Sequence, residues 1–205
     1  MKTRKYLSVS ELYSRKFRTA NIAPEWVEHL GTVELGATIL IWGESRNGKT
    51  SYALQMAKAF AMGGHRTLYM PLEEGPSLSF VMAMKRVRIE EARKIIIAPS
   101  AMSMEDLDAA LSERNAPVVV VIDSLQYSGL SYAQYKELRA AHESTTFIIT
   151  SHADGRDPRG TTAQSIKYDA GVKVLVADYI ANAGSRYGGG EPWTIWPDKL
   201  AAMEL

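Results

Sequence analysis

A glycine-bearing segment between an apolar run and a helix-forming run constrains the fold of this chain more than any other feature. Residues 37–42, Ala-Thr-Ile-Leu-Ile-Trp, predict a buried strand. Residues 49–62 predict a helix, which Gly63 and Gly64 end in the usual way. Between the two runs stands Gly43-Glu44-Ser45-Arg46-Asn47-Gly48-Lys49-Thr50. A strand, a tight loop and a helix in this order indicate an α/β protein.

The segment follows the spacing Gly-x-x-x-x-Gly-Lys-[Ser/Thr] of a phosphate-binding loop, or P-loop. Its glycines let backbone N–H groups converge on phosphate oxygens, and the following helix presents its positive end to the anion. Lys49 supplies a charge for the terminal phosphates, and the Thr50 hydroxyl suits Mg²⁺. We therefore predict that ATP and Mg²⁺ bind here, with the nucleotide held by Gly43, Glu44, Ser45, Arg46, Asn47, Gly48, Lys49, Thr50 and Ser51.

Composition narrows the class of protein. The 205 residues are 46% hydrophobic and 23% charged, which is enough for one sizeable core. A formal net charge of +1 argues neither for nor against a polyanionic partner. The chain has no cysteine, which excludes a disulfide framework and a thiolate metal site. No apolar run approaches the ~20 residues that span a bilayer, so we expect a cytoplasmic protein without a membrane partner.

Strands and helices continue to alternate along the chain. Strands are predicted over residues 67–70, 95–97, 118–122, 146–150, 172–176, 179–183 and 193–196, and helices from about 77, over 104–114 and over 132–142. Residues 154–164 are polar and punctuated by Gly and Pro, which predicts a loop. The pattern predicts a mostly parallel sheet flanked by helices, with an antiparallel edge at its C-terminal end.

Carboxylates follow two of these strands. Asp123 ends the most apolar run, where a parallel sheet places its ligand-facing groups. A carboxylate there can hold Mg²⁺ through water opposite Thr50, and the alternative is a cap for the next helix. Glu73 and Glu74 follow residues 67–70, where a carboxylate can orient a water for attack on the γ-phosphate. A solvated acidic turn is the alternative for this pair.

These segments together resemble the RecA-like superfamily, especially its DnaB-type helicase, RadA and KaiC branches. LYMPLEEG, residues 68–75, is similar to the segment with the catalytic glutamate, which implies that role for Glu73, with Glu74 as the second choice. VVVVIDSLQ, residues 118–126, is similar to the RadA region that contains the Mg²⁺-binding carboxylate. FIITSH, residues 147–152, resembles the strand that senses the γ-phosphate. This implies a sensor role for His152, a satisfied polar residue being the alternative.

The C-terminal part extends the resemblance. Residues 159–176 are similar to a loop and strand entry, with Asp169-Ala170-Gly171 where DnaB proteins have Asp-Ala-Asp. GSRYGGG, residues 184–190, resembles a KNRFG or KNRNG segment, whose Lys and Arg reach the neighbouring subunit's ATP site. The resemblance implies that Arg186 is an arginine finger, whereas Gly184 occupies the lysine position. The alternative for Arg186 is a residue of a flexible turn.

We divide the chain into a basic N-terminal arm, residues 1–20, and a RecA-like ATPase domain, residues 21–205. The arm contains one acid, Glu11, and six basic residues, Lys2, Arg4, Lys5, Arg15, Lys16 and Arg18. Its apolar residues recur at helical spacing, with Ser10 as the expected cap. Three interpretations remain open: a solvated tail, an oligomerisation helix that docks on the next subunit, and a DNA contact.

The resemblance implies an ATP-hydrolysing protein that forms a ring or filament and acts on DNA in replication or recombination. Its expected partners are ATP, further copies of the chain, and single-stranded DNA or proteins of replication and recombination. Residues 154–160, with Arg156 and Arg159, stand where the family has a DNA-facing loop. A small RecA-core protein of phage or mobile-element origin fits this description. The alternatives are an ATP-dependent scaffold or loader, and a small-molecule phosphotransferase, which the lack of an arginine-rich lid disfavours.

Overall fold

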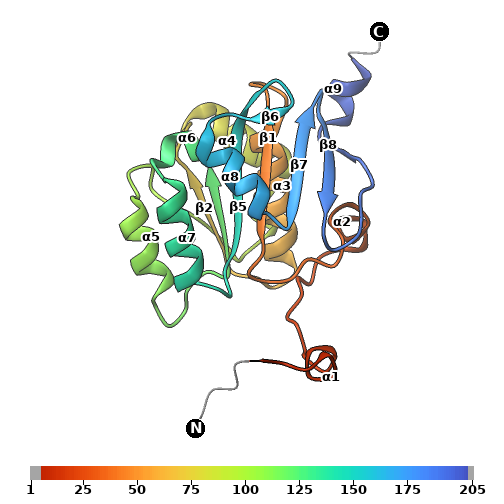
Figure 1. Ribbon diagram of the computed structural model, residues 1–205. Helices are drawn as coiled ribbons and strands as arrows, with labels where there is room; N and C mark the ends of the chain where they lie inside the picture. Colours follow the sequence, from red (N-terminus) through yellow and green to blue (C-terminus); the bar gives the residue numbers. More distant parts are fainter. Residues whose placement is uncertain (1–5, 203–205) are drawn as a thin grey trace.

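A computed structural model of the chain describes residues 6–202, so Lys2, Arg4 and Lys5 of the predicted arm lie outside the described residues. An open sheet forms its centre, with helices on both sides (Figure 1). The strands are β1 Thr38–Gly43, β2 Thr67–Pro71, β3 Ile95–Ile97, β4 Val119–Asp123, β5 Thr146–Asp154, β6 Asp157–Pro158, β7 Val172–Ala177, β8 Ile180–Ser185 and β9 Trp193–Thr194. The helices are α1 Val9–Tyr13, α2 Pro24–Leu30, α3 Lys49–Met62, α4 Leu78–Val87, the 3₁₀ helix η1 Ile89–Glu91, α5 Met104–Leu111, α6 Leu125–Ser128, α7 Tyr132–Ala141, α8 Thr161–Asp169 and α9 Pro197–Ala201. Within these described residues, none of the helices has the length and apolar character that crossing a bilayer requires.

The strand order is β3-β2-β4-β5-β1-β7-β8-β9, with β6 paired to β5. Pairing is parallel from β3 through β7, because helical crossovers return the chain to the same end of the sheet before each new strand. The pairs β7–β8 and β8–β9 are antiparallel. The predicted fold class, a mostly parallel sheet with an antiparallel C-terminal edge, is confirmed.

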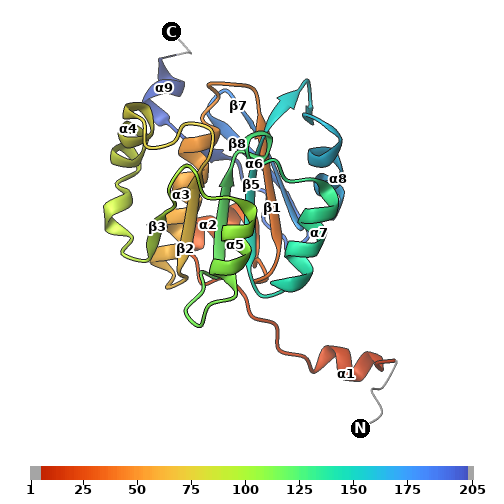
Figure 2. The same cartoon turned by 90° about the vertical axis from the view of Figure 1, so that its left-hand side faces the viewer.

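Two apolar layers hold the helices on the sheet. Along β1, Ile39 and Ile41 pack into the layer shared with α2, α3 and α4, whereas Leu40 and Trp42 pack into the layer shared with α5 to α8. Successive side chains of a strand point to opposite faces, so a strand buried on both faces must be apolar throughout. Figure 2 shows α3 and α4 on one side of the sheet and α7 and α8 on the other.

Three local predictions were wrong. The predicted loop 154–164 contains β6 and the start of α8, because Ala163 and Ile166 bury one face of that helix against the sheet. The predicted strand 193–196 ends after β9, and Pro197 begins α9. The cap of α1 is Ser8, not Ser10: the Ser8 side chain accepts from the Glu11 N–H, and Glu11 accepts from the Ser8 N–H.

Helix α1 stands apart from the rest of the chain, at the end of the molecule opposite α9 (Figures 1 and 2). Its side chains Val9, Leu12 and Tyr13 are 66%, 46% and 85% exposed. The chain rejoins the body at Thr19, which forms a β-bridge with Glu34. The described part of the arm therefore presents apolar side chains that no part of the body covers.

Candidate nucleotide-binding site

The carboxyl ends of the parallel strands bring four predicted site residues to one edge of the sheet: Gly43, Glu73, Asp123 and His152. In the β1–β5 pair Gly43 lies opposite His152, and in the β2–β4 pair Pro71 lies opposite Asp123. The P-loop leaves β1 at this edge, and the segment with Glu73 leaves β2 beside it. An open parallel sheet binds ligands at this end of its strands.

The P-loop backbone has the shape that a phosphate requires. Arg46 and Gly48 have positive φ angles, 67° and 96°, which turn the chain tightly before α3. Gly48 is the N-cap of α3 and has no side chain that could bond the first N–H groups of the helix. These N–H groups and the positive end of the helix are therefore directed at an anion.

Lys49 begins α3 and lies among negative charges. Its Nζ atom donates to the Glu44 carbonyl oxygen at 2.8 Å. Burial lowers the pKa of Lys49 below its ordinary value, and the charges of Glu73, Asp123 and Glu44 oppose this effect. The ammonium group is therefore close to both the predicted catalytic carboxylate, Glu73, and the predicted Mg²⁺ ligand, Asp123.

Asp123 is buried, with 6% of the residue exposed, and both oxygens of its carboxylate accept hydrogen bonds. The Tyr69 hydroxyl donates to its Oδ2 atom at 2.6 Å, and the Thr150 hydroxyl donates to Oδ1 at 2.5 Å. Burial raises the pKa of Asp123, and hydrogen bonds from Thr150, Tyr69 and Thr50 oppose the rise. The hydrogen bonds of Asp123 therefore connect it to β2, β5 and α3. Asp123 is not the cap of the next helix, because Ser124 takes the N-cap position of α6. The Thr50 hydroxyl and this carboxylate form the oxygen pair that Mg²⁺ prefers.

Glu73 faces the same edge. Its Oε2 atom accepts from the Ser124 hydroxyl at 2.9 Å and lies 3.0 Å from Nε2 of His152. Burial alone would raise the pKa of Glu73, but the hydrogen bonds from His152 and Ser124 and the charges of His152 and Lys49 hold it below its ordinary value. Glu74 lies differently, because its Oε2 atom accepts from Ser79 on α4 at 2.8 Å.

His152 is fixed through its backbone as well as its ring. Its N–H donates to Oε1 of Gln126 at 3.2 Å, and Nε2 of Gln126 donates to the Ser151 hydroxyl at 2.9 Å. The predicted DNA-facing segment starts just beyond, and the Arg159 N–H donates to the His152 carbonyl oxygen at 2.8 Å. Exposed Arg159 is therefore anchored at the γ-phosphate sensor candidate, whereas the carbonyl oxygen of exposed Arg156 accepts from the Trp42 ring N–H at 3.0 Å.

Sequence reasoning missed three polar residues of the site. Tyr69, Ser124 and Thr150 are all buried, and each donates a hydroxyl to Asp123 or Glu73. A tyrosine and a threonine inside strands look like ordinary strand formers, which gives no functional signal. Ser124 carried a signal, because it follows Asp123 directly at the strand end. The peptide bond between these two residues is cis.

A second missed group is aromatic and borders the P-loop. A Cβ atom on Gly48 would lie 3.1 Å from Cδ1 of Tyr179, so this ring touches the loop. Tyr179 meets Trp196 edge to face with ring centroids 5.9 Å apart, and the Arg86 guanidinium lies 3.7 Å above the Trp196 ring. Arg86 also contacts the Ser51 hydroxyl at 3.4 Å. Both rings are half-buried, so they keep an accessible surface beside the loop.

Arg186 is not brought to this edge. Tyr179 touches the P-loop, and β8 runs from there to the opposite end of the sheet, where Ser185 pairs with Val172 at the start of β7. Six residues of strand span about 20 Å. The Arg186 guanidinium is exposed and donates to the Tyr168 carbonyl oxygen at 3.1 Å.

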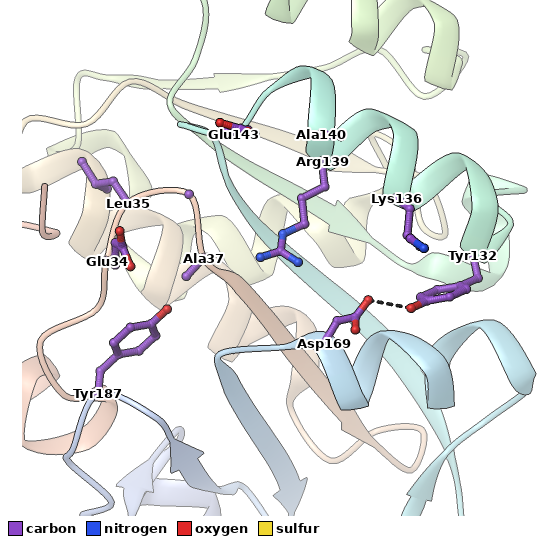
Figure 3. A pocket seen from close by; sticks show the side chains of 11 residues that line it. Glu34, Leu35, Ala37, Tyr132, Lys136, Arg139, Ala140, Glu143, Asp169 and Tyr187 are labelled. Carbon is purple, nitrogen blue, oxygen red and sulfur yellow. Dashed lines mark hydrogen bonds between the residues drawn. The ribbon is translucent and has the colours of Figure 1, made fainter. Parts of the chain in front are cut away.

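Beside Arg186 lies a cavity of about 530 Å³ at the start of β1. Its lining includes Tyr187, Asp169 and Arg139. Figure 3 shows Asp169 bonded to the Tyr132 hydroxyl, with the Arg139 side chain extending from α7 toward the cavity. Arg186 therefore belongs to a surface that is separate from its own P-loop.

The chain has sequence relatives among known proteins. No protein-family model matches the chain. It is 33% identical over 154 residues to the DNA repair protein RadA of Chlamydia trachomatis and 30% identical over 153 residues to that of Chlamydia muridarum. Each alignment covers 67% of this chain and 33% of the relative, so the chain spans about a third of the length of these curated relatives.

A solved structure resembles most of the chain. The flagellar accessory protein FlaH from Methanocaldococcus jannaschii matches with a TM-score of 0.60 at 14% identity, covering 86% of this chain and 92% of that one. The chain has a RecA-like fold. The RadA relatives and the fold together support the predicted RecA-like ATPase family, while the particular branch and a phage origin stay predictions.

Proposed function

We propose that the chain hydrolyses ATP in the presence of Mg²⁺. One observation carries the proposal: Glu73 is fixed by Ser124 and His152 at the same sheet edge as Lys49 and Asp123. A P-loop alone supports nucleotide binding, whereas hydrolysis also needs a carboxylate that can accept a proton from water. Hydrogen bonds and positive charges hold the pKa of Glu73 below its ordinary value, so the side chain is ionised at neutral pH, the form that a proton acceptor requires.

Each residue has a role in this proposal. The loop amides and Lys49 bind the phosphates, and Thr50 and Asp123 would hold Mg²⁺, which when bound neutralises charge on the phosphate oxygens. The Oε2 atom of Glu73 orients the attacking water and takes its proton. His152 and Ser124 hold that oxygen in place and link it to the end of β5, where the γ-phosphate is sensed. Tyr179 and Trp196 offer ring surface to the nucleotide base.

We further propose that copies of the chain associate into a ring or filament, and that Arg186 of one subunit completes the site of the next. Arg186 lies about 20 Å along β8 from its own P-loop, too far for one side chain to span. Helix α1 supports association, because Val9, Leu12 and Tyr13 are apolar and uncovered by the body of the chain. This favours the oligomerisation interpretation of the arm over a solvated tail.

The proposed context is DNA replication or recombination. The RadA relatives are named DNA repair proteins, and the backbone of exposed Arg159 bonds the sensor candidate His152, with exposed Arg156 in the turn between β5 and β6. DNA bound by Arg159 would therefore be connected, through one backbone hydrogen bond, to the residue that we propose senses the γ-phosphate. The second candidate function is an ATP-dependent scaffold or loader, which the glycine at position 184 favours because it removes one of the two trans cations that the resemblance implies.

The steady-state ATPase rate at several protein concentrations, with and without single-stranded DNA, tests the proposal. We expect measurable hydrolysis, a specific activity that rises as subunits associate, and further stimulation by DNA. Hydrolysis without any response to DNA would favour the scaffold function. Tight ATP binding without turnover would contradict the proposed ATPase activity.

A further inference from the structure

A second basic surface lies at the opposite end of the sheet from the P-loop. Arg66 directly precedes β2 and Lys94 directly precedes β3, and these strands are parallel with their first residues paired. The residues before them are therefore neighbours at the edge where the strands begin. Arg66, Arg93 and Lys94, together with Ile96, line a hollow of about 390 Å³.

Arg18 of the N-terminal arm joins this group. The pKa of His65 is lowered by burial and then by the positive charges of Arg18 and Lys94, which places both cations close to its ring. His65 accepts from the Asn21 N–H at 3.0 Å, so the segment after the arm is tied to the turn before β2. We call the four cations Arg18, Arg66, Arg93 and Lys94 the basic edge.

The bonds of Arg66 and Lys94 in the basic edge run to carbonyl oxygens. Within residues 6–202, none of its four side chains forms a salt bridge with a carboxylate. Arg66 donates to the Asn115 carbonyl oxygen at 2.6 Å and Lys94 donates to the Gly64 carbonyl oxygen at 2.7 Å. Arginine has five N–H donors and lysine three, so these bonds position the side chains and leave further donors for a ligand.

We propose that the basic edge binds the sugar-phosphate backbone of DNA. The inference rests on the proposed action on DNA, but it adds a contact on a different face from Arg156 and Arg159. Helix α1 lies beyond the same end of the sheet (Figure 1), and Arg15 and Lys16 follow it in the chain, between α1 and Arg18. The hollow contains one apolar side chain, Ile96, whereas the centre of a protein–protein interface is apolar and aromatic. A backbone contact needs only such cations.

The double variant Arg93→Gln/Lys94→Gln tests the inference by fluorescence anisotropy with labelled single-stranded and duplex oligonucleotides across a salt series. Because each lost phosphate contact removes about one unit from the slope of log affinity against log salt, we expect the slope to fall by about two. Affinity at low salt should fall several-fold for whichever strand form the wild type prefers. The matched control Lys85→Gln/Lys136→Gln removes two exposed charges elsewhere and should leave both values unchanged. ATP hydrolysis without DNA should be the same in all three proteins.

Failure of the inference and failure of the proposed function look different in this experiment. If the wild type binds DNA with a steep salt dependence that the double variant keeps, and Arg156→Gln/Arg159→Gln removes it instead, the basic edge is not a contact although DNA binding stands. If the wild type binds no DNA at low salt, both ideas fail. A double variant that unfolds at lower temperature is replaced by Arg93→Gln alone, which should lower the slope by about one unit.

Discussion

Nε2 of His152 lies 3.0 Å from Oε2 of Glu73 and so joins the end of β5 to the turn that follows β2. The contact connects the residue that would sense the γ-phosphate with the residue that would activate water. It crosses two strand positions of the sheet, because β4 lies between β2 and β5. In the proposed mechanism, one contact thus separates the group that senses the γ-phosphate from the carboxylate that activates water.

Glu73→Gln should keep ATP binding and lose at least about 100-fold in turnover, because the amide keeps the size of the side chain and removes the proton acceptor. ATP affinity by titration calorimetry and the steady-state rate measure the two effects. The control is Glu74→Gln, whose parent carboxylate bonds Ser79 on α4 and should matter little. The assignment is wrong if Glu74→Gln is the inactive variant.

Lys49→Ala should weaken ATP binding by about 10- to 100-fold, the effect of losing a charged hydrogen bond. The fold should persist, because the Nζ atom bonds only a loop carbonyl oxygen and fills no part of the core. Calorimetric titration gives the affinity, and thermal unfolding gives the control. Wild-type affinity in a folded variant would remove Lys49 from the site.

Trp196→Leu should raise KM for ATP by roughly 5- to 150-fold with little change in kcat, since stacking of a base on an aromatic ring contributes about 1–3 kcal/mol. The control Trp193→Leu should lower the unfolding temperature instead, because Trp193 stacks on Trp26 at 4.0 Å. Equal KM values in Trp196→Leu and the wild type would mean that the ring only packs against Arg86 and Tyr179.

Stability should depend on pH through His29. This buried ring lies 2.5 Å from the Glu191 carbonyl oxygen and 2.6 Å from the Tyr52 hydroxyl. Burial lowers its pKa below the ordinary 6.5, partly offset by the bond to Glu191, so the unfolded chain takes up a proton at a higher pH than the folded chain. The contribution of His29 to the free energy of unfolding is therefore fully present above pH 6.5 and is lost as the pH falls below this value.

The variant His29→Gln removes this group and should be less stable at neutral pH. Between neutral pH and about pH 5, its unfolding temperature should fall less steeply than that of the wild type. Thermal unfolding across this range measures the difference. Parallel curves for the two proteins would show that His29 does not take up the proton.

The parts of the site that sequence reasoning predicted are those set by local patterns. Helix α3 spans the predicted residues 49–62, and Asp123 ends a strand as expected, because an apolar run must stop where polar side chains begin. The missed contact between Tyr69 and Asp123 joins residues 54 positions apart and depends on the register of β2 against β4. Periodicity along one strand contains no information about that register.

The missed aromatic group depends on a contact between two elements that are far apart in the chain. Arg86 lies on α4 and Trp196 lies after β9, and they meet only because the antiparallel edge folds back beside the P-loop. The misread helix α8 has the same origin, since only Ala163 and Ile166 show its buried face among polar neighbours. Where burial involves few residues, loop and helix patterns are alike.

Arg186→Ala should lower turnover by about 10³-fold and leave nucleotide affinity at the variant's own P-loop nearly unchanged. The guanidinium lies at the far end of β8, exposed, with its backbone N–H bonded to the Gly171 carbonyl oxygen at 2.9 Å. It can act only on a phosphate that a second subunit brings to it. The variant should therefore lose the rise of specific activity with protein concentration while it still associates.

An equimolar mixture of Arg186→Ala and Lys49→Ala subunits decides whether the arginine acts in trans. Each variant alone lacks one half of every interface, whereas head-to-tail association of the two pairs an intact P-loop with an intact arginine at about a quarter of the interfaces. The mixture should therefore recover activity that neither variant has alone. Arg186→Lys, measured alone, should turn over more slowly than the wild type, because an ammonium group cannot bond two phosphate oxygens in a fork. Mixtures that co-assemble by light scattering and recover nothing would leave Arg186 as a residue of the turn.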